Sequence, residues 1–282
     1  MARICQVCKK PPITARHSYC ARCYKWCSVR KEIRARVRTL RKRYDPARDI
    51  FTCTYLLIPL DETDKDAPDA LTFHHPIPKK RGNVKVSCSF YNAMISDMTD
   101  NEGRKAVIAL ARHFQHGTRF DKKAVSFRYW NRAPLKAPRI LGAPPLRAWH
   151  ADKCLLCEKP PVPHTLYCAR CHKMADAPDF SMVMLQALKE AYDPATDSFL
   201  CHYTGVAVDL ENLGRPWDLT YDHPTPGDGS RLVVAAYWVN VMKTQLSEDE
   251  FRAVIIEMAR CFETGQPFRL EVCGFKYWKK RS

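Results

Sequence analysis

A helical pattern of apolar residues runs through positions 28–44, SVRKEIRARVRTLRKRY. The apolar residues are three or four positions apart: Val29, Ile33, Val37, Leu40 and Tyr44. This spacing predicts an amphipathic helix that buries one stripe. The remaining face is cationic, and its cations are Arg30, Lys31, Arg34, Arg36, Arg38, Arg41, Lys42 and Arg43. A solvated face normally mixes charges of both signs, so this run predicts a nucleic-acid contact strengthened by counterion release.

A second kind of helical segment begins at capping boxes. The motif TDNE at 99–102 and its counterpart SEDE at 247–250 predict helix N-termini, and Gly117 and Gly265 stand where such helices end. Each half of the chain reads in the same order: cysteine-rich loops, a helix, a short β segment, a capped helix and a terminal aromatic strand. The predicted fold class is α+β.

The chain repeats itself with a displacement of 148 residues. YDPARDIFTCTY at 44–55 returns as YDPATDSFLCHY at 192–203, and FRYW at 127–130 returns as FKYW at 275–278. A period of this length indicates duplicated domains rather than a solenoid, because each copy is large enough to fold around its own core.

We therefore predict a first copy in residues 1–130, which also carries the basic helix, and a second copy in residues 151–282. Residues 131–150 between them are rich in proline and lack apolar periodicity, which predicts a stiff linker. A single chain with two copies is expected to act as a monomeric pseudo-dimer.

Composition excludes several classes of protein. The 282 residues are 46% apolar, enough for two ordinary domains and unlike a disordered chain. No apolar run approaches the length of a membrane span, and the start, MARICQVCKK, lacks the apolar segment of a secretory signal. We expect a soluble, cytoplasmic protein with no membrane partner.

Charge is distributed unequally between the halves. Residues 1–150 hold 31 Lys+Arg against 12 Asp+Glu, a net charge of +19, whereas residues 151–282 hold 15 against 18, a net charge of −3. The first half is therefore the expected contact with a polyanion.

Eight of the fourteen cysteines form paired CxxC units, with eleven residues between the pairs in the first copy and ten in the second. Four thiolates match the tetrahedral preference of Zn²⁺ with no position left open, which predicts two structural zinc ions per chain. Disulfides and redox-active CxxC pairs are weaker alternatives, since no secretory signal is present and redox motifs occur as one pair per domain. The predicted ligands are Cys5, Cys8, Cys20 and Cys23, and Cys154, Cys157, Cys168 and Cys171.

A paired polar motif recurs at one spacing in both copies. LTFHHPIP at 71–78 corresponds to LTYDHPTP at 219–226. Asn92 follows His75 by seventeen residues, and Asn240 follows His223 by the same number. The recurrence of this spacing, the HPxP context and a neighbouring polar side chain that could hold a metal predict a functional site. The alternative is that the histidines cap a strand and bond within the core.

At these residues the chain resembles the HNH, or ββα-metal, nuclease family. TYDHPTP followed by LVVAAYWVN and MK is similar to that family's strand end and helix start, and the resemblance covers roughly residues 200–250 and 52–102. It implies a β-hairpin and a helix around one divalent cation, with a histidine that activates water and an asparagine that binds the metal or orients the histidine.

The family pattern assigns roles by position. It makes His223 and His75 the general bases, and Asp222, Asn240, His74 and Asn92 the ligands of Mg²⁺ or another divalent cation. Neutral imidazole accepts a proton near pH 7, and a hard cation neutralises charge on the scissile phosphate.

Two departures from the family affect these roles. Neither copy has the further helix histidine that many members carry, and only Cys88 remains where a core CxxC pair would begin. His74 stands where the second copy has Asp222, and we expect the second copy to be the more competent catalyst because carboxylate suits a hard cation.

The sequence therefore predicts a metal-dependent DNA endonuclease with two HNH-like sites. RNA is the alternative polymer, since cationic helices bind both. The alternative of another class is a zinc-ribbon nucleic-acid-binding protein whose nuclease fold has lost its activity.

Overall fold

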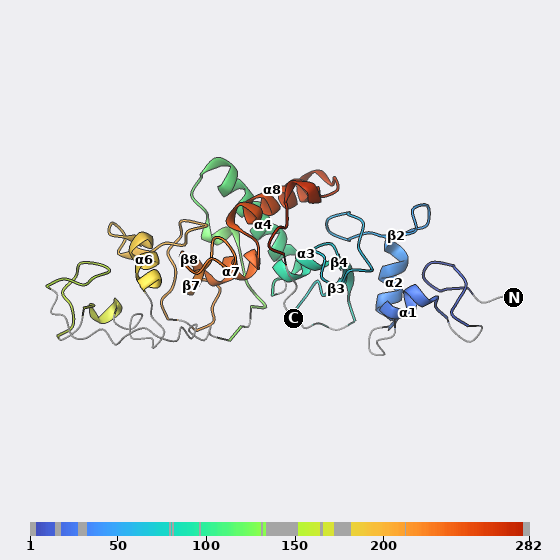
Figure 1. Cartoon of the computed structure of the whole chain (residues 1–282), viewed down its shortest axis with the longest axis horizontal. Helices are drawn as coiled ribbons and strands as arrows, with labels where there is room; N and C mark the ends of the chain where they lie inside the picture. Colours follow the sequence, from blue (N-terminus) through green and yellow to red (C-terminus); the bar gives the residue numbers. More distant parts are fainter. Residues whose placement is uncertain are drawn as a thin grey trace. The chain divides into compact units, whose positions relative to one another are not determined.

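We describe a computed structural model of the chain (Figure 1). It describes residues 4–14, 18–27, 33–78, 80, 82–95, 97–130, 132–133, 152–163, 166–171, 182–211 and 213–278. Most of the predicted linker therefore lies outside the described residues.

The described elements confirm a mixed α+β protein with small sheets. The helices are α1 Ala21–Cys27, α2 Ile33–Arg43, α3 Ser89–Met94, α4 Asp100–His116, α6 Met182–Ala191, α7 Tyr237–Lys243 and α8 Glu248–Thr264, with 3-10 turns η1 Lys122–Ala124 and η2 Leu270–Val272. The strands are β1 Tyr44–Asp45, β2 Ile50–Phe51, β3 Leu71–His74, β4 Lys85–Cys88, β5 Tyr192–Asp193, β6 Ser198–Phe199, β7 Leu219–Asp222 and β8 Val233–Ala236. The bounds of β3, β4 and α4 recur in β7, β8 and α8 after the same 148 residues that separate the sequence motifs.

A β-hairpin followed by a helix lies at the centre of each copy (Figure 1). In the first copy β3 pairs antiparallel with β4, and α3 begins directly after β4. In the second copy β7 pairs with β8 in the corresponding register, and α7 follows. All four residues of β8 are buried, because α6 packs against this strand as α2 packs against β4. The hairpin is thus a core element that presents its strand ends to the neighbouring helix.

The predicted capping box of α4 is confirmed. The Thr99 amide donates to Oε2 of Glu102 over 2.8 Å, and the Glu102 amide donates to the Thr99 hydroxyl oxygen over 3.2 Å. These bonds satisfy amides that the first turn of a helix leaves without partners. Helices α4 and α8 end one residue before Gly117 and Gly265, whose φ values of 61° and 69° fit the left-handed C-cap.

The prediction of a terminal aromatic strand is wrong for the described residues. FRYW and FKYW lie in turns and irregular segments, with η1 and η2 shortly before them. Glu102 and Glu250 instead hold these segments, since each buried carboxylate accepts one of their backbone amides, those of Arg128 and Lys276. A buried carboxylate of the preceding helix therefore holds each of these segments, in place of the β-sheet hydrogen bonds that a strand would make.

The two compact units of the chain do not follow the predicted boundaries at residues 130 and 151. Unit 1 comprises residues 1–115, 123–129 and 249–282, and unit 2 comprises residues 116–122 and 130–248. Each unit therefore contains residues of both sequence copies. Helix α8 and the segment after it, although they belong to the second sequence copy, are part of unit 1.

Aromatic side chains show how this exchange completes each core. In unit 1 the ring of Phe268 lies 5.2 Å from that of Phe90 on α3. In unit 2 Phe120 lies 5.9 Å from Trp238 on α7. Both pairs are related by the displacement of 148 residues, and all four side chains are buried. Aromatic residues bury large apolar areas, so each hairpin and helix depends on a segment from the other copy.

Helix α8 is also tied to the segment that follows it by a buried carboxylate. Glu257, 3% exposed, accepts bonds from the guanidinium groups of Arg260 and Arg269 and from the Arg269 amide. Although burial raises the pKa of Glu257, these donors outweigh it and hold the pKa at about 2.

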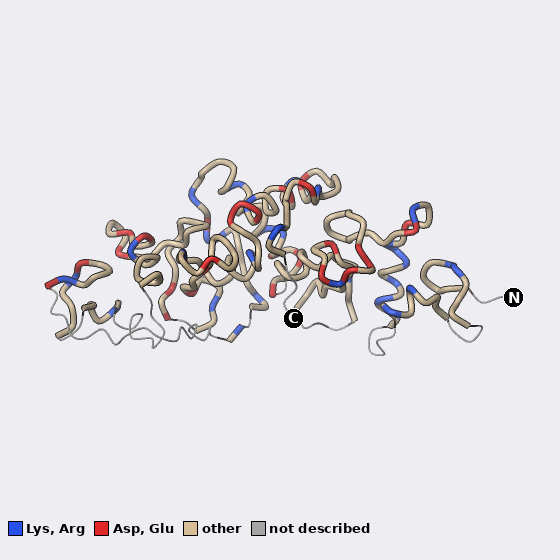
Figure 2. Tube along the Cα trace, in the orientation of Figure 1, with Lys and Arg blue, Asp and Glu red and all other residues tan. Residues whose placement is uncertain are grey.

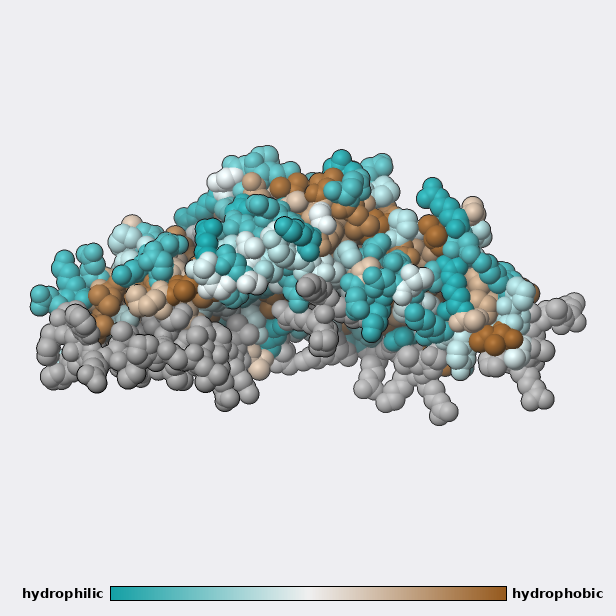
Figure 3. Space-filling view, in the orientation of Figure 1, coloured by the Kyte–Doolittle hydropathy of each residue, from teal (hydrophilic) through white to brown (hydrophobic). Residues whose placement is uncertain are grey.

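The apolar residues on the face shown in Figure 3 form small separate groups within a mainly hydrophilic surface. Among the described helices, none has both the length and the apolar stretch that a membrane crossing requires.

We predict that Phe268→Ala lowers the free energy of unfolding by about 3–5 kcal/mol, because it leaves a cavity against Phe90. Hydrogen exchange measured by mass spectrometry should become faster in β3, β4 and α3 and stay unchanged in β7 and β8. The matched variant Phe120→Ala should give the opposite distribution, with faster exchange in β7, β8 and α7. Faster hydrogen exchange in the hairpin of the substituted residue's own sequence copy would contradict the assignment of each aromatic residue to the core of the other copy.

We predict that Glu257 stabilises the protein in a pH-dependent way. Its folded-state pKa of about 2 lies below its ordinary value of 4.5, so the stabilisation is present above pH 4.5 and is lost as the pH falls towards 2. Glu257→Gln should lower the free energy of unfolding by about 2 kcal/mol near pH 7. In denaturant titrations the difference between the two proteins should shrink progressively below pH 4.5 and be nearly lost towards pH 2. A constant difference down to pH 2 would refute this origin.

Candidate functional site: two cysteine clusters and two strand-end sites

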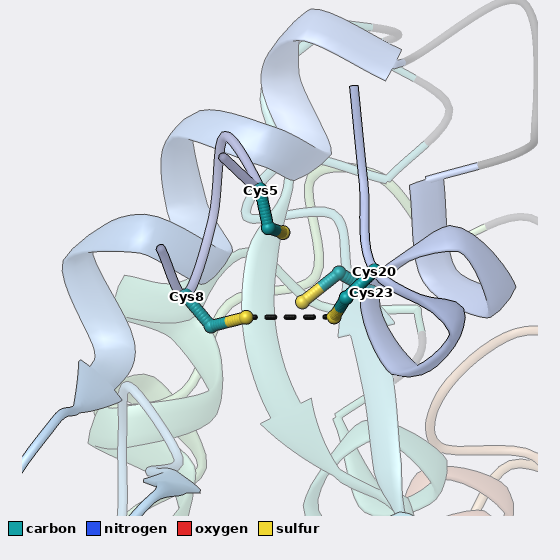
Figure 4. Close-up of side chains that lie close together, drawn as sticks. All are labelled: Cys5, Cys8, Cys20 and Cys23. Atoms are coloured by element: carbon teal, nitrogen blue, oxygen red, sulfur yellow. Dashed lines mark hydrogen bonds between the residues drawn. The ribbon is translucent and has the colours of Figure 1, made fainter. Parts of the chain in front are cut away.

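Each predicted cysteine quartet comes together in the structure. Cys5, Cys8, Cys20 and Cys23 form one cluster and Cys154, Cys157, Cys168 and Cys171 the other, with the ligand atoms of each within 4.8 Å of one another. Figure 4 shows the four sulfur atoms of the first cluster facing one another. All eight side chains are buried. Four converging thiols form a closed tetrahedral donor set, so both clusters are compatible with structural zinc.

Local backbone geometry shapes both clusters. Lys9 and Glu158, each directly after a CxxC pair, have positive φ values of 65° and 58°. The tight turns let the amides of Val7 and Leu156 point at the sulfur atoms of Cys5 and Cys154, over 3.4 and 3.5 Å. Amide donors stabilise a thiolate, the form that binds metal.

The repeated YDPxxD motif anchors the first cluster to the hairpin of β1 and β2. Asp49 accepts bonds from the Tyr44 hydroxyl, from Arg22 between the cysteines of one pair, and from Lys10 after the other pair. Lys10 and then Tyr44 are the main groups that lower the pKa of Asp49, to about 2.

The second cluster is held in the same manner. Asp197 interacts with Tyr192, Arg170 and Lys159. The recurring YDPxxD motif therefore docks the cysteine loops in both copies.

The strand-end site of the first copy brings its two predicted ligands together. Nδ1 of buried His74 lies 2.9 Å from Oδ1 of Asn92 on α3. Nε2 of His74 lies 3.0 Å from Oδ1 of Asp100, at the start of α4. The Tyr55 hydroxyl donates to Asp100, with 3.0 Å to each carboxylate oxygen. Imidazole, carboxamide, carboxylate and phenol thus meet beneath the end of β3.

The corresponding site of the second copy is organised differently. Asp222, also buried, accepts a bond from the Tyr203 hydroxyl and pairs with Lys243, whose Nζ lies 3.2 Å from Oδ2. Asn240 donates instead to the Thr220 hydroxyl over 3.1 Å and to the Tyr221 carbonyl over 3.0 Å. The two predicted ligands, Asp222 and Asn240, therefore have separate partners.

The pKa of Asp222 reflects this setting. Burial raises the pKa above its ordinary range, and the attraction of Lys243 opposes the rise. Asp222 is part of a buried ion pair rather than an open carboxylate. Its oxygen atoms already contact the ammonium of Lys243, so they are poorly placed to bind a metal cation.

Both predicted bases turn away from the buried residues beside them and bond to the loop that follows. Nδ1 of His75 lies 3.3 Å from the Lys80 carbonyl oxygen, and Nδ1 of His223 lies 2.9 Å from the Asp228 carbonyl oxygen. A carbonyl only accepts, so Nδ1 carries the proton and, in neutral imidazole, Nε2 carries the lone pair. This is the tautomer that a general base requires.

Sequence reasoning missed Asp100, Tyr55 and Lys243. Asp100 lies in the TDNE capping box, a pattern that predicts a helix start and no functional site. Lys243 was visible at the end of the family-like motif, and the displacement of 148 residues pairs it with Ile95. That pairing, together with His74 at the position of Asp222, indicates in the sequence that the two sites differ in charge.

The basic helix is observed as α2, with Val37 and Leu40 buried as predicted. Arg34, Arg38, Arg41 and Lys42 are exposed, and Figure 2 shows the cationic positions along this helix. Two of its cations have intramolecular contacts: Arg36 lies 4.4 Å from the centre of the Phe73 ring, and Nη2 of Arg43 lies 3.4 Å from the Thr54 carbonyl oxygen. Val29, Arg30 and Lys31 lie outside the described residues.

The six cysteines outside the quartets are buried, as predicted: Cys27, Cys53, Cys88, Cys201, Cys261 and Cys273. Their surroundings are those of small core residues.

Comparison with known proteins identifies no relative: no family model, no curated protein and no solved structure matches the chain.

We predict that the purified protein holds two zinc ions per chain. Cys8→Ser and Cys157→Ser should each remove one ion, because a three-cysteine site loses a charged ligand and closure of the shell. Elemental analysis after extensive dialysis measures the count. Cys201→Ser, a buried cysteine outside both clusters, is the control and should keep two. Wild-type protein free of zinc, or a Cys8→Ser protein that keeps both ions, would contradict the assignment.

Proposed function

We propose that this chain is a metal-dependent endonuclease that hydrolyses phosphodiester bonds in DNA, built from two tandem copies of a zinc ribbon joined to a ββα-metal unit. The observation that carries the proposal is the convergence of His74, Asn92 and Asp100 beneath the end of β3, with His75 as the next residue. A hairpin and helix that hold an imidazole against a carboxylate form a site at which a divalent cation and a base are adjacent.

The donor set of the first copy fits a divalent cation. Nε2 of His74 faces the carboxylate of Asp100, and both atoms are ligand types that Mn²⁺ and Mg²⁺ sites use. Asn92 contacts the other ring nitrogen, so it is better placed to orient the imidazole than to bind the same ion. When bound, the cation would neutralise charge on the phosphate and its leaving oxygen.

His75 supplies the base in this proposal. Its Nδ1 is held by the Lys80 carbonyl, which leaves Nε2 as the proton acceptor for the attacking water. His74, the last residue of β3, is buried, whereas His75, one residue beyond the strand, bonds through Nδ1 to the carbonyl of the following loop. The base is therefore kept off the cation ligands, as hydrolysis requires.

The cationic first half provides the contact with DNA. Arg34, Arg38, Arg41 and Lys42 extend from α2 into solvent, and phosphate contacts of this kind give binding that weakens steeply with salt. The docked zinc ribbon beside α2 holds Arg41 through a 2.8 Å bond from Nε to the Gln6 carbonyl.

A second candidate function rests on the second copy. The ion pair of Asp222 and Lys243 uses the carboxylate that the family pattern assigns to metal. If the first site were equally inactive, the chain would be a zinc-ribbon nucleic-acid-binding protein without catalysis.

We predict that zinc-loaded protein cleaves supercoiled plasmid in the presence of Mg²⁺ or Mn²⁺. His75→Ala should slow cleavage by about 10²–10⁴-fold through loss of the base, and Asp100→Asn should abolish it through loss of the anionic ligand. His116→Ala, at an exposed histidine outside both sites, is the control and should cleave at the wild-type rate. Gel electrophoresis of the plasmid gives the rates, and an RNA transcript in parallel reactions identifies the preferred polymer.

Wild-type protein that binds the plasmid but leaves it intact in both metals would refute the hydrolase and favour the binding protein. Undiminished cleavage by His75→Ala would refute the assignment of the base instead.

A further inference from the structure

Lys243 is one of the most deeply buried charged side chains in the described part of the chain, at 1% exposure. Its Nζ is surrounded by oxygen atoms: Oδ2 and Oδ1 of Asp222 at 3.2 and 3.5 Å, and the carbonyl oxygen of His223 at 2.9 Å. The ammonium thus lies at the strand end, against the backbone of the predicted base. An oxygen-lined position beside a carboxylate is the environment that a hard metal cation also selects.

Removing an ammonium and a carboxylate from water costs several kcal/mol for each ion, and an apolar pair of similar volume is often as stable. Burial of Lys243 is therefore poorly explained by stability alone. The position of Lys243 explains its burial better, since the ammonium neutralises Asp222 within the site.

The first copy lacks this ammonium. Ile95 occupies the position that corresponds to Lys243, and it is fully buried. The described contacts of the Asp100 carboxylate are with Tyr55 and His74, and none is with a lysine or arginine. The Asp100 carboxylate thus has no ammonium or guanidinium partner among the described contacts, whereas Lys243 faces the Asp222 carboxylate in the second site. A divalent ion at Asp100 would supply the missing positive charge.

We infer that the ammonium of Lys243 takes the place of a divalent cation in the second copy, so that only the first copy binds a catalytic metal ion. The inference deepens the proposed function and rests on it for its consequence: the enzyme has one hydrolytic centre and cuts one strand of duplex DNA per binding event. It reverses the expectation that Asp222 makes the second copy the more competent site.

Binding of Mn²⁺ to the full-length, zinc-loaded protein tests the inference without relying on activity. Electron paramagnetic resonance of free Mn²⁺ during a titration gives the number of ions bound per chain. We expect one exchangeable ion in the wild type, none in Asp100→Asn, and still one in the double variant Asp222→Asn/Lys243→Met. The double variant removes both charges with little change of volume, so it avoids an unpaired buried ion. Loss of one ion in this double variant would overturn the inference.

Lys243→Ile is the complementary variant, because it copies Ile95 into the second site. It leaves Asp222 without its cation, and the number of bound Mn²⁺ ions should rise by one. A folded variant, judged by its zinc content and circular dichroism, that binds no additional ion would overturn the inference. If Lys243→Ile does not fold, the number of Mn²⁺ ions bound by Asp222→Asn/Lys243→Met tests the inference by itself.

The plasmid assay separates this inference from the proposed function. Wild type and Asp222→Asn/Lys243→Met should both convert supercoiled plasmid to the nicked form with no early linear product. A protein that cleaves nothing, while Lys243→Ile gains one Mn²⁺ ion, would refute the nuclease and support the replacement of metal by lysine. Rapid linear product from the wild type would show a second active centre and overturn the inference.

Discussion

Burial of aromatic residues across the two sequence copies is the constraint on which both hairpin-and-helix units depend. Phe268 covers Phe90 in unit 1, and Phe120 covers Trp238 in unit 2. Neither core is complete with residues of its own copy, because the segment after each capped helix belongs to the opposite unit. Each unit therefore takes part of its core from a segment that is remote in the sequence. The strand-end sites inherit this dependence, since their helices are positioned by these aromatic contacts.

Two kinds of charged interaction add to these aromatic cores, one at the surface and one in the interior. At the surface, Asp49 and Asp197 dock the cysteine loops onto short hairpins through exposed lysine and half-buried arginine and tyrosine partners. Each contact is individually weak where water screens it. In the interior, Glu257 and Asp222 have partners that they cannot lose without leaving a buried charge unpaired. Docking is thus distributed over many contacts, whereas the site of the second copy depends on a single ion pair.

The two strand-end sites illustrate how one framework supports different chemistry. The same displacement that superposes β3 on β7 pairs His74 with Asp222 and Ile95 with Lys243. A lysine ammonium therefore faces the buried carboxylate in the second site, whereas an imidazole faces the carboxylate in the first. The proposed single hydrolytic centre follows from that difference.

The sequence by itself determined the features that depend on local spacing. The cysteine quartets, the capping box of α4, its C-cap glycine and the strand ending at His74 all followed from residue intervals, because turn and helix geometry relate neighbouring residues directly. Tertiary structure alone decided which distant groups meet. Asp100 contacts His74, Asn240 and Asp222 have separate partners, and nearly all of α8 belongs to unit 1. These outcomes depend on competition between partners far apart in the chain, where burial and charge neutralisation select the pairing and no local pattern records it.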